Sequence, residues 1–406
     1  MLKNLGHPPH LYPLPSGERV RGEGIPSNQQ TFRHCQQMKV LVTGGAGFIG
    51  SHLTDLLVQE GFDVRVLDNL DPQVHPDGKP GYLNPAAEFI QADVRDREPL
   101  FKALSGCEAI VHLAAAVGVG QSQYRIRHYM ETNAVGTAQL FDILANEKHR
   151  VAKILVAASM SSYGEGRYLC AKCGLVKPGL RPEEQMALKE WEPYCPSCHG
   201  ALKPVPTSEE TPQDCNSIYA LTKRIQEETA LIFGRTYRIP TVALRFFNAY
   251  GSRQSLSNPY TGVTAIFLSR LKAGQPPVVY EDGGQTRDFI SVKDVCRAML
   301  ISLRRSEADY RVFNVGSSRP LPIAELARIL SASLGLKIEP QITLTFRKGD
   351  VRHCFADITR IRETLGWQPE ISFEKGIEEL IAWAAEASSE DRFLQAQAEM
   401  ADRGLI

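Results

Sequence analysis

A tyrosine and a lysine in the segment SIYALTK have the residue types and the spacing for proton transfer. Tyr219 and Lys223 lie four residues apart, so a helix in this segment places both side chains on one face. A phenol has a pKa of about 10 and is a poor base at neutral pH, but a nearby ammonium lowers this pKa by favouring the phenolate. The pair therefore indicates a tyrosine that accepts a proton.

The glycine-rich segment VTGGAGFIGSHL is typical of a strand–turn–helix junction that binds a dinucleotide. Gly44 permits the tight turn, Gly47 lets the backbone approach a pyrophosphate, and Gly50 lets the helix pack on the strand. The free N–H groups and the positive dipole end of the helix then face the phosphates. Asp68 ends the second expected strand, and this combination predicts a dinucleotide site.

Two acidic residues at strand ends bear on the choice of cofactor. Asp68 is expected to accept hydrogen bonds from the hydroxyls of the adenosine ribose, and its charge repels a 2′-phosphate. NAD is therefore favoured over NADP. Asp93 ends the third expected strand, where it either meets the adenine amino group or caps the next helix.

Four of the nine cysteines form two Cys-x2-Cys pairs, separated by about 20 residues as in a zinc ribbon. Four thiolates fill a tetrahedral shell and leave no position for water, so the predicted zinc is structural. A disulfide or redox pair and unliganded thiols are the alternatives, and the ribbon serves either as a lid or as a dimer contact. The predicted ligands are Cys170, Cys173, Cys195 and Cys198.

Strands that alternate with helical segments from Lys39 onward predict a doubly wound parallel sheet. We expect an α/β protein of Rossmann type with a smaller C-terminal α/β substrate lobe and an inserted zinc ribbon. The first residues are rich in Pro, Gly and charge, which favours a disordered extension and translation from Met38. The expected divisions are 1–37 (extension), 38–250 (NAD-binding domain, with the ribbon at about 165–205), 251–385 (mainly substrate lobe, with returning core elements) and 386–406 (C-terminal helical tail).

The charge balance of the 406 residues argues against a nucleic-acid-binding protein. Basic and acidic side chains number 46 each, whereas nucleic-acid binders normally have a basic excess. No apolar run approaches the roughly 18–20 residues that span a bilayer, and the N-terminus lacks the apolar core of a secretory signal. We therefore expect a cytoplasmic protein with neither a nucleic-acid nor a membrane partner.

The motifs taken together resemble those of one enzyme family. From Met38 to about Trp383 the chain is similar to the extended short-chain dehydrogenase/reductases that act on nucleotide sugars, the NAD-dependent epimerase/dehydratase family. The shared motifs are TGGAGFIG (43–50), Asp68, HLAA (112–115), NAVGT (133–137), S-x3-YG (159–164), YALTK (219–223), RFFNAYG (245–251), GGQTRDFI (283–290) and GDVRHCFADITRIRETLGW (349–367).

The resemblance implies roles for individual residues. Ser159, Tyr219 and Lys223 become the catalytic set, in which Tyr219 deprotonates a sugar hydroxyl and Ser159 hydrogen-bonds the same oxygen. The cofactor-binding positions implied are Gly44, Gly47, Phe48, Ile49, Gly50, Asp68, Asn69, Asp93, Val94, Leu113, Ala114, Ala115, Asn133, Tyr219 and Lys223. The substrate-binding positions implied are Ser161, Asn248, Val263, Arg287 and Arg352, with arginine suited to bidentate phosphate binding.

The residues after Ser159 favour epimerisation among the reactions of this family. Related dehydratases carry an Asp-Glu pair there, but Met160 and Ser161 stand in this chain and neither eliminates water. We expect oxidation at C4, rotation of the 4-keto sugar and return of hydride to the other face, with NAD tightly held. No acid and carboxylate partner for a decarboxylase is identified.

The inserted cysteine segment makes the chain similar to the dTDP-L-rhamnose 4-epimerase group, which implies interconversion of dTDP-L-rhamnose and dTDP-6-deoxy-L-talose. A UDP-glucose or UDP-glucuronate 4-epimerase is the alternative, followed by a nucleotide-sugar dehydratase or reductase. A non-catalytic NAD-binding regulator is disfavoured, because Ser159, Tyr219 and Lys223 are all present. Relatives are typically homodimers, so we expect an interface formed by the helices that carry residues 133–148 and 219–233.

Overall fold

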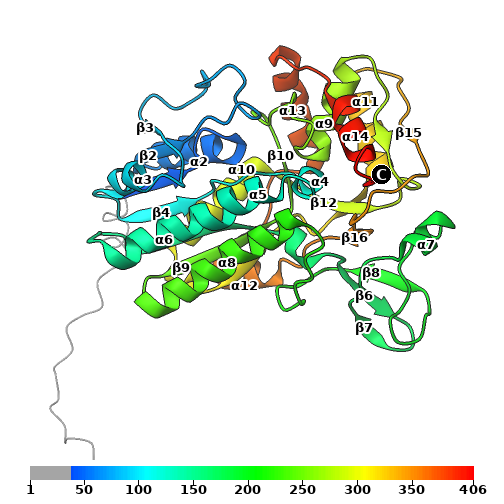
Figure 1. The fold of residues 1–406 in the computed structure, drawn as a ribbon, viewed down its shortest axis with the longest axis horizontal. Coiled ribbons are helices and arrows are strands. Elements are labelled where there is room, and N and C mark those ends of the chain that lie inside the picture. Colours follow the sequence, from blue (N-terminus) through cyan, green and yellow to red (C-terminus); the bar gives the residue numbers. More distant parts are fainter. Residues whose placement is uncertain (1–37) are drawn as a thin grey trace, which may run out of the picture.

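A parallel seven-stranded sheet forms the centre of the protein (Figure 1). The computed structural model describes residues 38–406, so the expectations about residues 1–37 concern positions outside this range. The spatial order is β13-β9-β5-β4-β1-β2-β3, and every neighbouring pair is parallel. The strands are β1 (Lys39–Thr43), β2 (Asp63–Asp68), β3 (Glu88–Gln91), β4 (Ala109–His112), β5 (Lys153–Ser159), β9 (Thr241–Phe246) and β13 (Val312–Val315).

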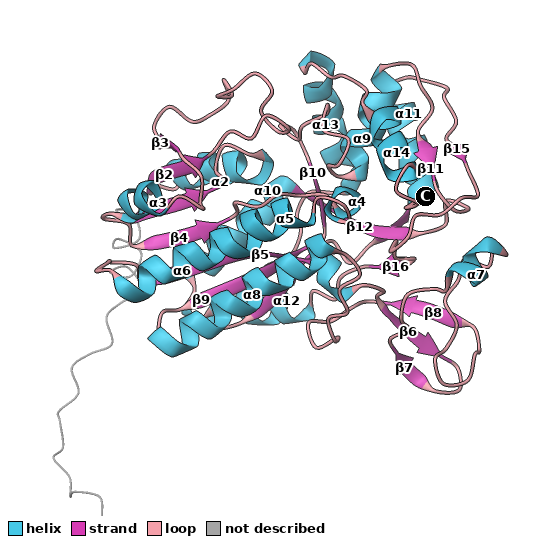
Figure 2. Cartoon of the chain, in the orientation of Figure 1, coloured by secondary structure: helices cyan, strands magenta, loops and turns pink. Residues whose placement is uncertain are grey.

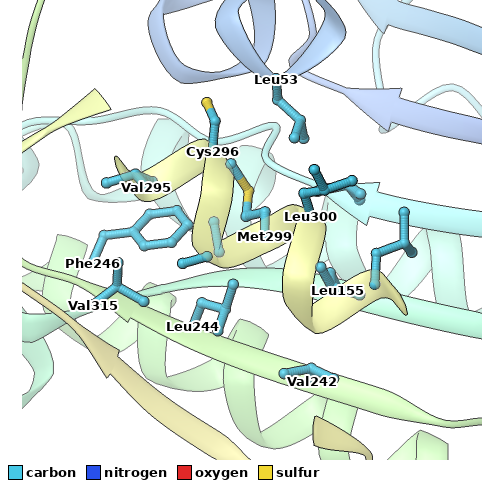
Figure 3. Packing of buried hydrophobic residues seen from close by; sticks show 14 of the residues in the cluster. Leu53, Leu155, Val242, Leu244, Phe246, Val295, Cys296, Met299, Leu300 and Val315 are labelled. Carbon is cyan, nitrogen blue, oxygen red and sulfur yellow. The ribbon is translucent and has the colours of Figure 1, made fainter. Parts of the chain in front are cut away.

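Helices cover both faces of this sheet, as the apolar strands predict (Figure 2). Because strand side chains alternate, Val40 and Val42 of β1 join the core on one face and Leu41 joins the core on the other. Figure 3 shows the first core, where Leu53 and Met299 pack between helices and sheet. Its helices are α2 (Phe48–Gln59), α10 (Val292–Arg304) and α12 (Thr359–Leu365), and those of the second core are α3 (Arg97–Leu104), α6 (Gly136–Asn146) and α8 (Ile218–Tyr237).

The order in which strands are added to the sheet reverses at β1 and β4, which defines the place where a ligand is expected. Strands β2 and β3 extend the sheet on one side of β1, and β4, β5, β9 and β13 extend it on the other. In open parallel sheets, ligands bind outside the carboxyl ends of the strands at this switch point. The prediction of a Rossmann-type fold is therefore confirmed.

A smaller lobe is built on a third apolar core from the later part of the chain. Its short strands and helices lie beside the carboxyl ends of the central sheet (Figure 1). They are β10 (Asn248–Tyr250), β11 (Val278–Val279), β12 (Thr286–Ser291), β14 (Pro320–Pro322), β15 (Gln341–Ile342), β16 (His353–Cys354), α9 (Val263–Lys272), α11 (Ile323–Ser333), α13 (Phe373–Glu386) and α14 (Phe393–Ala401).

The cysteine-bearing insertion folds as a separate three-stranded antiparallel sheet of order β7-β6-β8. It projects from the body of the molecule below β16 in the view of Figure 1. Its elements are β6 (Arg167–Cys170), β7 (Gly174–Val176), α7 (Glu183–Ala187) and β8 (Leu202–Val205).

Short helical segments complete the described part of the chain. They are α4 (Val119–Ser122), α5 (Ile126–Tyr129), a π-helical turn (Met130–Val135) that leads into α6, and two 3₁₀ turns (Met160–Tyr163 and Ser306–Ala308). Among residues 38–406, no helix combines the length and the apolar character that a membrane crossing requires.

Candidate active site and cysteine cluster

The glycine turn after β1 is packed too closely for side chains at two of its three glycines. Gly44 has φ +69°, and a Cβ there would lie 2.8 Å from the backbone nitrogen of Ala114. A Cβ on Gly50 would overlap Gly44 and come within 2.6 Å of Gly45. A Cβ on Gly47 would meet only the Gly44 carbonyl oxygen at 3.4 Å, so no packing excludes it. The open side at Gly47 is therefore where the backbone can receive a pyrophosphate.

The N-terminus of α2 is available to an anion. Its N-cap, Gly47, provides no side-chain cap, and the first turn contains no acidic residue. Helix N-termini offer unpaired N–H groups and a positive dipole end. The first turn contains the predicted cofactor positions Phe48, Ile49 and Gly50. These features fit a dinucleotide phosphate.

Asp68 lies at the end of β2 and braces the glycine turn. Its carboxylate accepts hydrogen bonds from the backbone N–H of Ala46 (3.0 Å) and of Leu70 (2.9 Å), and the residue is buried. The same carboxylate thus combines a structural task with its predicted ribose contact.

Asp93 is already paired in this structure. It accepts bonds from the side chain and backbone N–H of Arg95 and from the amide of Asn69 (2.9 Å). Partial burial acts to raise the pKa of Asp93, but the Arg95 and Asn69 bonds outweigh it and lower the pKa to about 2. The next helix, α3, has Asp96 rather than Asp93 at its N-cap. Val94 is buried against Gly136.

Ser159 and Tyr219 meet at the carboxyl end of β5. Ser159 is the last residue of this strand, and its hydroxyl accepts bonds from the backbone N–H (3.2 Å) and the hydroxyl (2.9 Å) of Ser161. Tyr219 lies in the first turn of α8, which begins after Ser217, whose hydroxyl accepts a bond from the Ala220 N–H (3.1 Å). Burial raises the pKa of Tyr219, and the nearby Ser159 hydroxyl opposes this rise. The structure thus brings these two predicted catalytic residues together.

Lys223 is buried one helical turn beyond Tyr219. Burial lowers its pKa to about 7, with a smaller opposing influence from the charge of Glu227. Its Nζ donates to Oε1 of Gln226 at 2.7 Å. Within the described residues no hydrogen bond joins Lys223 to Tyr219, so the lowering of the Tyr219 pKa by this ammonium stays a prediction.

A buried chain of hydrogen bonds holds Gln226 in place. The Gln226 amide donates to the Thr137 hydroxyl (2.8 Å), which in turn donates to the Asn133 carbonyl oxygen (2.6 Å). The Thr137 oxygen also meets Nε2 of His112 (2.9 Å), and Nδ1 of His112 meets the Thr43 hydroxyl (2.8 Å). This pattern assigns the imidazole proton to Nε2. Burial and Lys223 lower the pKa of His112 to about 3, so the ring is neutral.

The chain of hydrogen bonds through Gln226 contains site residues that sequence reasoning did not identify. Gln226 lies three residues after Lys223 and so on the same helix face, which is the one local signal that could have found it. Predicted cofactor residues Leu113, Ala114 and Ala115 follow His112 directly at the end of β4. The amide of Asn133 is engaged with Ala116 (2.7 and 3.0 Å) and Thr222 (2.9 Å), so it fixes α8 against the strand end.

The residues predicted to bind the substrate differ in their present contacts. Ser161 donates its hydroxyl hydrogen to Ser159 (2.9 Å). Asn248 begins β10, and its side-chain oxygen is buried without a hydrogen-bond partner, as expected of a group that meets a ligand. Val263 begins α9. The guanidinium of Arg287 donates to backbone carbonyls, including that of Val351 (2.7 Å).

Arg352 lies just before β16, which is paired with β12, the strand of Arg287. Its guanidinium is 3% exposed and is bound by the carboxylates of Glu281 (2.9 Å), Asp282 (2.7 Å) and Glu192 (2.8 Å). The two arginines predicted to bind a diphosphate are therefore neighbours, and both have protein partners in this structure.

The four predicted metal ligands form one cluster. Their Sγ atoms all lie within 4.8 Å of one another, and those of Cys170 and Cys198 are 3.5 Å apart. Thiolates about 2.3 Å from a tetrahedral zinc ion stand roughly 3.8 Å from each other, so this donor set fits zinc. Backbone N–H groups of Cys173 and Lys172 lower the pKa of Cys170 to about 6, which favours the thiolate. The cluster can hold zinc with no position left for a substrate.

We predict that the purified protein contains about one zinc ion per chain. Cys195→Ser should lose the metal and lower the thermal midpoint, because a small lobe depends on its metal for folding energy. Cys215→Ser, outside the cluster, is the control and should keep the zinc. Elemental analysis measures both, and a full zinc content in Cys195→Ser would contradict the assignment.

The sequence matches two family profiles. Residues 40–182 match the NAD dependent epimerase/dehydratase family, and residues 196–380 match GDP-mannose 4,6 dehydratase. A dTDP-L-rhamnose 4-epimerase from Burkholderia thailandensis is 37% identical over 355 residues, which cover 86% of this chain and 95% of that protein.

Solved structures share the fold over a similar extent. The UDP-glucose 4-epimerase of Thermotoga maritima, determined with UDP-glucose, has a TM-score of 0.71 and 31% identity, covering 86% of this chain and 99% of that chain. The UDP-glucuronic acid 4-epimerase of Bacillus cereus, in complex with UDP-glucuronic acid and NAD, has a TM-score of 0.71 and 25% identity with the same coverage.

The two profile matches together span the glycine turn, the residues at the end of β5 and the first turn of α8. NAD occupies the homologous epimerase from Bacillus cereus, in agreement with the open glycine turn described above. The chain belongs to the NAD-dependent epimerase/dehydratase family of short-chain dehydrogenases/reductases.

Proposed function

We propose that this chain is a nucleotide-sugar 4-epimerase that interconverts dTDP-L-rhamnose and dTDP-6-deoxy-L-talose. One observation carries the proposal of catalysis. Ser159 and the half-buried Tyr219 lie at the carboxyl edge of the sheet, where the glycine turn also lies, and the Ser159 hydroxyl acts to lower the pKa of Tyr219. A proton acceptor and a cofactor-binding turn at the same edge of the sheet are suited to the oxidation of a secondary alcohol.

The chain's own side chains handle the proton. Tyr219 takes the proton of the sugar 4-hydroxyl and later returns it to the reduced oxygen, while Ser159 holds that oxygen by a hydrogen bond. Lys223, when protonated, favours the phenolate form of Tyr219. NAD, when bound, supplies the acceptor and donor of the C4 hydride. The sugar turns between the two transfers, so the configuration at C4 is inverted and the cofactor is unchanged overall.

The surroundings of Ser159 argue against dehydration. The next two residues are Met160, which is buried, and Ser161, which is bonded to Ser159. The nearest carboxylate along the chain is Glu165, which is fully buried and accepts bonds from Tyr168 and two backbone N–H groups. It has no free position from which to protonate a leaving hydroxyl.

The choice of sugar rests on the relative from Burkholderia thailandensis and on the four-cysteine insertion. A UDP-glucose or UDP-glucuronate 4-epimerase is the second candidate, favoured by the two solved relatives. The catalytic residues have the same task in both, so the candidates differ only in the sugar and base that the site accepts.

We predict that dTDP-L-rhamnose incubated with the protein yields its 4-epimer, with UDP-glucose and UDP-glucuronate as parallel trials. In D₂O the product should carry no deuterium at C4, because the hydride comes back from the cofactor. Tyr219→Phe should reduce kcat by about 10²–10⁴-fold while NAD stays bound. NMR of the products measures this, and full activity in Tyr219→Phe would show that the base is misassigned.

We predict that Asp68→Asn weakens NAD binding and reduces the preference for NAD over NADP at least about tenfold. Two unit charges about 4 Å apart interact by about 4 kcal/mol at an effective dielectric of 20, so loss of the carboxylate removes a strong repulsion of the 2′-phosphate. Ala46 and Leu70 donate to different oxygens of this carboxylate, so asparagine keeps one of the two bonds and loses the other. Titration with both cofactors measures the ratio, and an unchanged ratio would refute the ribose role.

We also propose that the protein forms a homodimer. Its cytoplasmic location stays a prediction. The helices expected to form the interface expose apolar side chains, namely Val135 (54% exposed) before α6, and Leu221 and Ile232 (57% exposed) on α8. Sedimentation of the purified protein should give twice the mass of one chain, and Ile232→Asp should give the monomer. A wild-type protein that sediments as a monomer at micromolar concentration rejects the interface.

A further inference from the structure

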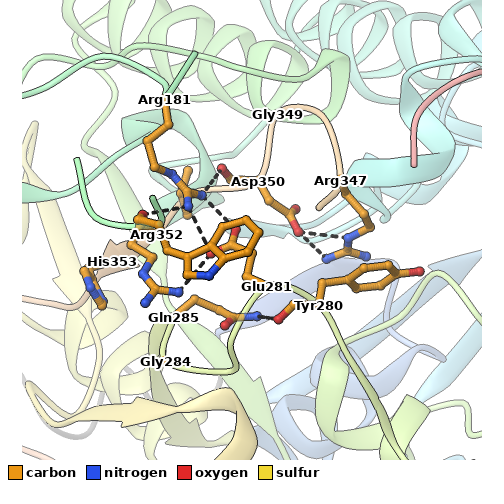
Figure 4. A network of polar contacts seen from close by, with 12 residues as sticks. Arg181, Tyr280, Glu281, Gly284, Gln285, Arg347, Gly349, Asp350, Arg352 and His353 are labelled. Atoms are coloured by element: carbon orange, nitrogen blue, oxygen red, sulfur yellow. Dashed lines mark hydrogen bonds and ion pairs between the residues drawn. The ribbon is translucent and has the colours of Figure 1, made fainter. Parts of the chain in front are cut away.

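A buried ion network joins the cysteine-bearing insertion to the segment that carries Arg352 (Figure 4). Arg181 comes from the insertion and is 1% exposed. Its guanidinium makes two bonds of 2.9 Å to the carboxylate of Glu281, and it donates to the carbonyl oxygen of Trp191 (2.9 Å). Arg352 binds the same Glu281 carboxylate from the other side. The insertion is thus anchored on this network.

Carboxylates outnumber guanidinium groups in the network. Two arginines face four acidic side chains, one of which is also bound to His353 at 3.0 Å. A diphosphate that approached Arg352 would add further negative charge where positive charge is already exceeded. One carboxylate must therefore leave before an anion can bind. The four are Glu165, Glu192, Glu281 and Asp282.

Of the four carboxylates in the network, that of Glu192 is the least restrained by its surroundings. Its side chain is 51% exposed, whereas that of Glu281 is 2% exposed and is shared by both arginines. Asp282 makes two bonds to Arg352 and a third to the N–H of Gly284 (2.9 Å). Among residues 38–406, the Glu192 carboxylate contacts only the side chains of Arg352 (2.8 Å) and His353 (3.0 Å) and, unlike Asp282, has no backbone donor.

The backbone on both sides of Glu192 is restrained. The Glu192 side chain can therefore move while the rest of the insertion stays in place. The carbonyl of Trp191 is held by Arg181, and Pro193 follows with a restricted φ. Partial burial acts to raise the pKa of Glu192, but the bonds from His353 and the charge of Arg352 outweigh it and lower the pKa to about 2. The group that has to leave is therefore a charged carboxylate at neutral pH.

The network lies beside the proton-transfer residues. Glu165 follows Ser159 by six positions and accepts a bond from the backbone N–H of Arg352 (2.6 Å). The amide of Asn216, three residues before Tyr219, donates to the carbonyl oxygen of Gly349. Two hydrogen bonds thus link the segments that carry Ser159 and Tyr219 to the segment that carries Arg352.

We propose that Glu192 occupies, on Arg352, the place of an anionic group of the nucleotide sugar, and that the diphosphate displaces it on binding. This inference rests on the proposed function. The insertion then forms one side of the substrate site. The Glu192 side chain moves away when the ligand binds, while Arg181 keeps the insertion attached to the rest of the protein.

The test measures binding of dTDP and UDP to the NAD-loaded protein by titration calorimetry. Glu192→Gln keeps a hydrogen-bond acceptor but removes the competing charge, so dTDP should bind about three- to tenfold more tightly at low salt. Glu190→Gln is the matched control, because Glu190 lies in the same loop and contacts Tyr194 rather than Arg352. Its affinity should equal that of the wild type.

A crystal structure of the complex with dTDP supplies the second measurement. The Glu192 carboxylate should lie beyond hydrogen-bond distance of Arg352, with a phosphate oxygen in its place. Unchanged or weaker dTDP binding by Glu192→Gln, or a complex in which Glu192 still holds Arg352, overturns the inference and leaves the epimerase proposal intact. Failure of the wild type to bind either nucleotide would overturn both.

Discussion

The close approach between the glycine turn and the carboxyl end of β4 is the constraint on which the site geometry depends. No Cβ fits at Gly44 beside Ala114, and none fits at Gly50 beside the turn. Helix α2 therefore begins directly against the edge of the sheet, and its free N–H groups face the switch point. Because β5 ends at the same edge, Ser159 and Tyr219 lie beside the cofactor seat.

A buried polar chain carries this arrangement into the protein. It runs from Thr43 through His112 and Thr137 to Gln226 and ends on Lys223. A buried lysine with only a neutral hydrogen-bond partner is costly, which explains the fall of the Lys223 pKa to about 7. Such perturbed groups are characteristic of functional sites. The chain fixes where this lysine lies, at some cost in stability.

The insertion has two ends with different tasks. Four cysteines at one end gather to within 4.8 Å and can close the small lobe around a metal, since its three short strands enclose little apolar surface of their own. At the other end, Arg181 is buried between Glu281 of the smaller lobe and Glu165 at the start of the insertion. Removal of one member of such a network leaves a buried charge unpaired, so the contact ties the insertion to Arg352.

Short-range patterns in the sequence determined the Rossmann fold, the glycine turn, the tyrosine and lysine on one helix face, and the four-cysteine cluster. Each of these depends on residues a few positions apart, or on two such pairs. The partners of Gln226 and Arg181 were decided only by the tertiary structure, because Gln226 meets Thr137 across 89 positions and Arg181 meets Glu281 across 100. No local spacing encodes such contacts. They arise when helices and loops pack against one sheet edge and buried polar groups must find partners there.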